Sequence, residues 1–170
     1  MLSKLIVAAV AALALSLTAE AQKPKFGHFD SGALIESLPE AQAMKKTMEA
    51  ESAKCEAQLT ALQEDFSKQV SAYQATQKNM TSEEQAAKEE ELQDMQQRII
   101  TYRQTAMQDL QKKQQELITP ISQKVLNAVQ QVGANNGFLY IFEAKAGLVL
   151  SIGSQSVDVT DLVKKQLGIK

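Results

Sequence analysis

The sequence predicts an α+β protein, mostly α-helical, in which a long antiparallel coiled-coil hairpin projects from a small β body that oligomerisation completes. Three observations support this fold class. Glycine and proline are scarce and lie mostly outside the middle of the chain, which is typical of long helices. Apolar residues in the middle recur every three, four or seven residues, which is the spacing of a coiled coil. Short apolar runs bounded by turn residues lie near the two ends, where strands are expected.

The N-terminal residues have the pattern of an export signal. Lys4 is followed by an almost unbroken apolar run from 5 to 17, and Ala19-Glu20-Ala21 supplies the small residues that a signal peptidase accepts. The run is shorter than the roughly 20 residues that a membrane-spanning helix needs, so a membrane anchor is the less favoured alternative. We therefore predict a signal peptide over residues 1–21, cleaved after its last alanine, and an exported mature chain that begins at Gln22.

Residues 39–133 are expected to form the helical hairpin arm. Pro39 suits the first turn of a helix, where its missing N–H costs no hydrogen bond. The first helix carries two rows of residues spaced by seven, and such a narrow stripe is typical of a coiled coil rather than of a helix on a broad globular core. The rows are Met48, Cys55 and Leu62, and Leu59, Phe66, Tyr73 and Met80.

The tip of the arm is expected near residues 78–82, where the apolar pattern is interrupted. Either Thr81 with Glu84 or Ser82 with Gln85 fits a capping box, in which a hydroxyl accepts from the first free N–H groups and the later side chain reaches back. The first helix would therefore end near the start of this segment, and the second would begin at its end.

The second helix is expected to run from about residue 83 to 132, antiparallel to the first. Its polar face is rich in Gln, Lys and Glu, and its apolar stripe continues the coiled-coil pattern. Pro120 lies inside this stripe and predicts a kink or break near residues 117–119, because proline removes a hydrogen bond and clashes with the preceding turn. At about 1.5 Å per residue the two helices would be about 60 Å and 75 Å long.

Residues 22–38 and 134–170 are expected to form the small β body. Lys25 to Phe29 alternates polar or small residues with aromatic ones and predicts a strand. Phe138 to Phe142 is apolar on both faces and predicts a buried strand. Residues 148–152 predict one more strand, and a last short helix closes the chain.

These two segments are too short to form a stable body alone. A single cysteine, Cys55, allows no internal disulfide. Without disulfide bonds, fewer than about 70 residues rarely form a hydrophobic core large enough to stabilise a fold. Short strands also leave open edges. We therefore predict that several subunits pool their strands, with a hairpin-stabilised monomer as the alternative. The oligomerisation candidates are Phe26, Phe29, Phe138, Tyr140, Phe142, Leu148 and Leu150.

The order of elements and several local sequences resemble the Skp/OmpH family of periplasmic chaperones. The resemblance depends on the order of elements and the local sequences taken together, and it covers nearly all of the mature chain. The matching sequences are KFGHF (25–29), LIESLPE (34–40), ITPI (118–121) and VDVTDLV (157–163). The resemblance implies a periplasmic homotrimer whose three arms enclose a cavity for unfolded outer-membrane proteins. The resemblance also implies that the protein uses neither ATP nor a cofactor.

The net charge of -2 departs from the strongly basic charge of the best-known family members. No lipopolysaccharide site is therefore carried over, and attraction to membrane surfaces is not expected to drive binding. The same charge gives no support to nucleic-acid binding, which needs a concentrated positive field.

A holdase of this kind needs many weak, adaptable apolar contacts along its arms, which methionine and aromatic side chains provide. The client-contact candidates are Met80, Phe66, Tyr73, Met95 and Tyr102. Met80 lies in the predicted loop. The other four also fit the seam between the two helices, which is the more common role of residues at heptad spacing.

An enzyme or a metal protein is not expected. His28 and Cys55 are the sole histidine and cysteine, which are too few for a zinc or similar site. The sequence also has no recognisable nucleophile–base pair or phosphate loop. The alternative to a holdase is a structural or adaptor coiled coil of the cell envelope, whose hairpin would bind one folded partner rather than many unfolded chains.

Overall fold

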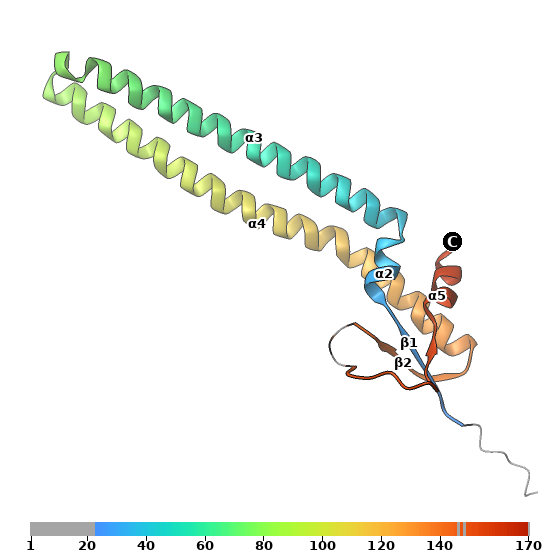
Figure 1. The fold of residues 1–170 in the computed structure, drawn as a ribbon. Coiled ribbons are helices and arrows are strands. Elements are labelled where there is room, and N and C mark those ends of the chain that lie inside the picture. The colour runs from blue at the N-terminus through green and yellow to red at the C-terminus, as the bar shows by residue number, and fades with distance from the viewer. Residues whose placement is uncertain (1–22, 146, 148, 170) are drawn as a thin grey trace, which may run out of the picture.

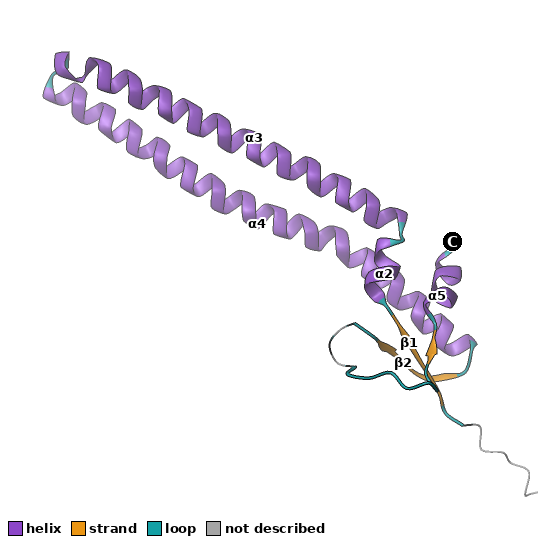
Figure 2. Ribbon diagram, in the orientation of Figure 1, coloured by secondary structure: helices purple, strands orange, loops and turns teal. Residues whose placement is uncertain are grey.

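A long helical hairpin projects from a small three-stranded body in the computed structural model, which describes residues 23–145, 147 and 149–169 (Figure 1). The predicted α+β, mostly α-helical fold, with a long antiparallel hairpin projecting from a small β body, is therefore confirmed (Figure 2). The predicted signal peptide lies outside the described residues. No helix in the described ranges is long and apolar enough to cross a membrane. The elements are β1 (Lys25–Phe29), α2 (Ser31–Glu36), α3 (Pro39–Thr76), the 3-10 turn η1 (Gln77–Asn79), α4 (Ser82–Asn135), β2 (Phe138–Glu143), β3 (Val157–Asp158) and α5 (Thr160–Leu167).

The tip of the arm is closed by one of the two predicted capping boxes. The backbone N–H of Glu84 donates to the Thr81 hydroxyl at 3.3 Å, and the backbone N–H of Thr81 donates to the Glu84 carboxylate at 2.8 Å. Gln85, the partner in the other predicted box, instead donates to the backbone carbonyls of Gln77 and Met80. These bonds satisfy N–H groups at the start of α4 and carbonyls of η1 and of the loop that follows it.

Pro120 does not break α4, so of the kink or break predicted near residues 117–119 the break is wrong. The helix continues from Ser82 to Asn135 with Pro120 inside it. The following turn is fixed because Ile121 and Val125 are buried in the body core. In the preceding turn, the Thr119 hydroxyl donates to the Gln115 carbonyl at 2.7 Å. Packing on one side of the proline therefore compensates for the backbone hydrogen bond that it removes.

The sheet is entirely parallel, with strand order β2-β1-β3. The predicted strand at 148–152 does not form: Leu148 lies outside the described residues, and residues 149–152 are irregular. The second edge of β1 is taken by the short β3, in which Val157 pairs with Gly27. The backbone N–H of Val159 then donates to the His28 carbonyl at 2.9 Å, which places α5 beside the sheet.

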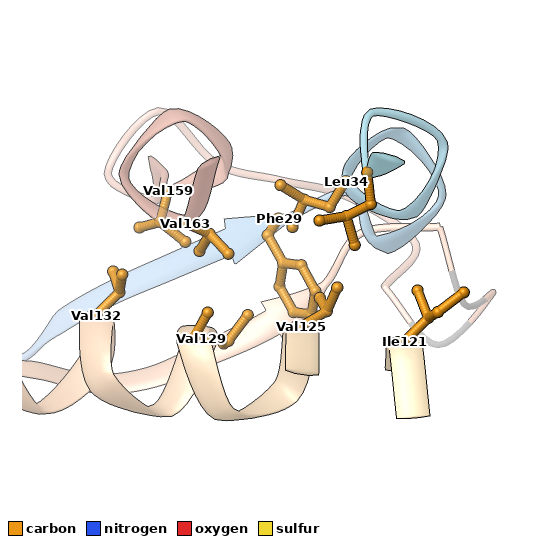
Figure 3. Close-up of a cluster of buried hydrophobic side chains, with 10 residues drawn as sticks. Phe29, Leu34, Ile121, Val125, Val129, Val132, Val159 and Val163 are labelled. Carbon is orange, nitrogen blue, oxygen red and sulfur yellow. The ribbon is translucent and has the colours of Figure 1, made fainter. Parts of the chain in front are cut away.

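The body core lies between the sheet, the last turns of α4, and the short helices α2 and α5 (Figure 3). Phe29 points from β1 toward Val125 on α4. The last part of α4, which the sequence pattern assigned to the arm, therefore supplies one wall of this core. Its buried residues are Phe29, Leu34, Leu38, Ile121, Val125, Ala128, Val129, Val132, Val159 and Val163.

Candidate interaction surfaces on the body and the arm

The seam between α3 and α4 holds most of the predicted client-contact residues. Tyr73 is buried at 8% exposure, and its hydroxyl donates to the Glu89 carboxylate at 2.6 Å. This hydrogen bond to Glu89 raises the pKa of Tyr73 above its usual range, because ionisation would place two negative charges together. Tyr73 therefore joins the two helices near the tip.

The other candidates on the stripe are half-buried. The Tyr102 hydroxyl donates to the Cys55 carbonyl at 3.4 Å across the seam. Phe66 and Met95 occupy the repeating half-buried positions that run along the two helices. Met80 follows η1 at the tip and is also half-buried. The structure thus places four of the five candidates along the seam pattern and one at the tip.

The outer face of the sheet carries a group of aromatic side chains that the described part of the chain covers only partly. Phe26 and Tyr140 stack with ring centroids 6.3 Å apart, and Phe142 lies 5.9 Å from Tyr140. Tyr140 and Phe142 are 58% and 47% exposed. Phe142 and Phe26 line an open hollow of about 700 Å³ whose other side includes Leu150 and Ile152. We call Phe26, Tyr140 and Phe142 the aromatic face.

Two oligomerisation candidates lie on the opposite, inner side of the sheet. Phe29 is 5% exposed and belongs to the chain's own core, so its first role is intrachain packing. Phe138 is half-buried, and the Lys25 ammonium lies 4.0 Å from its ring centroid. A Cβ at Gly27 would lie 3.1 Å from the Phe138 ring, so glycine permits this close packing. A third candidate, Leu148, lies outside the described residues.

Charged and polar groups near the end of β1 join this strand to α2 and to the segments that follow β2. Asp30 accepts from the backbone N–H of Ala33 at 3.0 Å and pairs with Lys145. The Lys145 ammonium and the Ala33 N–H hold the pKa of Asp30 below its usual range. The His28 ring nitrogen lies 2.9 Å from the Ser156 hydroxyl. Over the described part of the chain, no group of three or more potential ligands could hold a metal ion.

Comparison with known proteins identifies the family. The family model for OmpH-like outer membrane proteins matches residues 25–167. This chain belongs to the OmpH-like family. It is 24% identical over 166 residues to the chaperone protein Skp of Yersinia enterocolitica, which covers 98% of this chain and 99% of that protein. The crystal structure of an OmpH-like protein from Caulobacter crescentus has the same fold, with a TM-score of 0.73 at 17% identity, covering 85% of this chain and 84% of that one.

The OmpH-like arm also exposes two apolar residues that were missed as candidates. Ile100 and Met107 are 45% and 67% exposed on α4. Both lie off the seam stripe, to which four of the five predicted client-contact residues belong. Their separation by seven residues, which keeps two side chains on one face of a helix, was the signal that could have found them.

Proposed function

We propose that this chain is a periplasmic, ATP-independent holdase that binds unfolded outer-membrane proteins and prevents their aggregation. The observation that carries the proposal is the arm. Along most of their length α3 and α4 pack on each other alone, so their outer sides stay open to solvent over tens of ångströms (Figure 1). A long, open surface suits a disordered client, which has no fixed shape to fit a closed pocket. Family membership and the chaperone Skp as a relative support the same function.

We further propose that the aromatic face joins subunits, as a homotrimer in keeping with the family resemblance. An exposed apolar patch marks an interaction site in a protein of this size. Tyr140 and Phe142 are about half exposed although their strand is apolar on both faces. The free edge of β2 also presents unpaired backbone groups to a neighbouring strand. Joining several bodies in this way would hold several arms around one client.

Export to the periplasm rests on the predicted signal peptide of residues 1–21. The same compartment would bring the mature chain into contact with outer-membrane proteins before they reach the membrane. It contains no ATP supply, which agrees with a chaperone that holds clients by binding alone.

A dilution experiment tests the proposal. An eight-stranded outer-membrane β-barrel protein, unfolded in urea, is diluted into ATP-free buffer with and without mature chain 22–170, and aggregation is followed by light scattering. Serum albumin at the same mass concentration is the control for nonspecific protection. We expect suppression at about one oligomer per client, and albumin to give none. An excess of folded, oligomeric protein that leaves scattering unchanged would refute the holdase and favour an envelope adaptor with one folded partner.

A further inference from the structure

The exposed apolar residues in the part of α4 that pairs with α3 lie on one flank of the helix. Ile100 and Met107 are the exposed large hydrophobic residues of α4 before it enters the body core at Ile121, whereas no large hydrophobic residue of α3 is exposed to this degree within the described chain. The half-buried Ile118 follows eleven residues after Met107. Separations of seven and eleven residues correspond to about two and three helical turns. The three side chains therefore form one line along α4, roughly 27 Å long at about 1.5 Å per residue.

The same flank is lined by glutamine rather than by carboxylates. By helical spacing, five exposed glutamines flank the line, and none of their side chains hydrogen-bonds to another residue of the described ranges. The nearby acidic residues Asp94, Asp109 and Glu116 fall on other sides of the helix by the same spacing. We call Ile100, Met107 and Ile118, with these glutamines, the α4 flank. The glutamines are Gln93, Gln96, Gln104, Gln111 and Gln114.

We propose that the α4 flank is the surface on which the arm binds an unfolded polypeptide. This inference rests on the proposed holdase function and assigns its contact surface. An unfolded chain presents scattered apolar side chains together with unpaired backbone N–H and C=O groups. Each glutamine amide offers both a donor and an acceptor for that backbone, while Ile100 and Met107 offer apolar contacts, and Met adapts to irregular shapes. At about 3.3 Å per residue, the line spans about eight residues of an extended client.

A second copy of this chain is a poor occupant for the flank. Stable protein interfaces bury about 1,200 Å² or more, whereas two partly exposed side chains supply only a small fraction of that area. A helix from another subunit would also need a continuous apolar stripe for coiled-coil packing. On the flank, polar residues fill the intermediate positions. The α4 flank therefore fits a client held by many weak contacts.

Site-specific photocrosslinking tests this assignment on the full mature chain. Met107→benzoylphenylalanine places a photoreactive group on the flank. Thr105→benzoylphenylalanine places it two residues earlier, about 200° around the same helix, at another exposed position. The probe is the urea-unfolded eight-stranded barrel protein. We expect strong crosslinks from position 107 and several-fold weaker ones from position 105. Equal crosslinking from both positions would overturn the assignment.

Paired substitutions provide the second measurement. Ile100→Gln with Met107→Gln removes the apolar contacts, whereas Ile100→Leu with Met107→Leu keeps them. We expect the glutamine pair to weaken client binding about tenfold and the leucine pair to bind like the wild type, with unchanged circular dichroism and sedimentation. If the glutamine pair binds the client as tightly as the wild type, the assignment of the α4 flank is refuted but the holdase function is not. Failure of the wild type to bind would refute the holdase itself, and a glutamine pair that alters the oligomer without client would assign the flank to subunit contacts.

Discussion

The rings of Phe26 and Tyr140 stack with their planes 6° from parallel on a sheet face that stays partly exposed in the described chain. The pair joins neighbouring strands, since Phe26 and Tyr140 are register partners in β1 and β2. The intrachain core uses the other face, where Phe29 packs against α4 (Figure 3). The body thus packs its core against one face of the sheet and exposes aromatic side chains on the other.

Tyr140→Asp should separate the subunits without unfolding them. A carboxylate on the aromatic face would have to lose its water on association, with no partner to compensate. The 58% exposed side chain makes little contribution to the chain's own core. Sedimentation velocity should show monomers, and circular dichroism should show wild-type helical content. Leu126→Asp, at a 49% exposed position on α4, is the control and should stay oligomeric. A Tyr140→Asp protein that stays oligomeric would refute the proposal that the aromatic face joins the subunits.

Leu34→Ala should destabilise the body strongly. Leu34 is fully buried and belongs to the core cluster with Phe29 and Val163, so the substitution leaves a cavity that costs about 2–5 kcal/mol of unfolding free energy. Urea unfolding at a fixed protein concentration measures this change, because assembly makes stability concentration-dependent. Leu126→Ala should change the unfolding free energy by less than about 0.5 kcal/mol. Similar losses for both variants would contradict the placement of the core.

Tyr73→Phe should separate a seam role from a client-contact role. The ring stays packed, and the loss of the hydrogen bond to Glu89 should lower the unfolding free energy by about 0.5–1.5 kcal/mol. Suppression of client aggregation should be unchanged at a temperature where both proteins are folded. A variant that keeps its stability but loses suppression would place Tyr73 in client binding and contradict the seam assignment.

The capping box at the tip should open in acid. Hydrogen bonds from the Thr81 backbone and hydroxyl hold the pKa of Glu84 below its usual range. Because the folded-state pKa lies below the unfolded one, this stabilisation is complete above the ordinary Glu pKa and is lost as pH falls through the folded-state value. NMR shifts of the Thr81 amide should follow that titration. Glu83→Gln should leave the profile unchanged, whereas Glu84→Gln should remove it; a titration that survives in Glu84→Gln would refute the box.

The arm could be predicted from the sequence because its structure depends on local periodicity. The heptad row of Leu59, Phe66 and Tyr73 defines the side of α3 that meets α4, and Pro39 begins that helix as predicted. The effect of Pro120 could not be decided from the sequence because it depends on distant packing. The local rule allows a kink or a break, and the helix stays unbroken because Ile121 and the rest of the following turn are held by a core built from both ends of the chain.

The body was harder to predict because strand faces depend on register. The alternation in Lys25 to Phe29 predicted a strand but did not tell which aromatic ring faces inward. A bulge at Leu139 shifts the register of β2, so that Lys25 pairs with Phe138 and Phe26 with Tyr140. An extra residue on one strand changes which side chains share a face, and this separates Phe138 from the aromatic face. The strand predicted at 148–152 did not form, since residues 149–152 are irregular and the short β3 pairs with β1 as the third strand.

The α4 flank could not be predicted from heptad positions. Ile100 and Met107 are isolated apolar residues among polar ones, and single exposed apolar residues are normal on protein surfaces. The structure shows that these two residues lie outside the seam between α3 and α4. They are therefore not needed to pair the two helices and are available for another role.

The most direct test of the account is sedimentation velocity of the mature chain mixed with the urea-diluted barrel protein, without ATP or detergent. A holdase should give one soluble species that contains one oligomer and one client. Circular dichroism difference spectra should show that the client in this species is still unfolded. A client that pellets while the oligomer sediments at its own unchanged rate would contradict the holdase function.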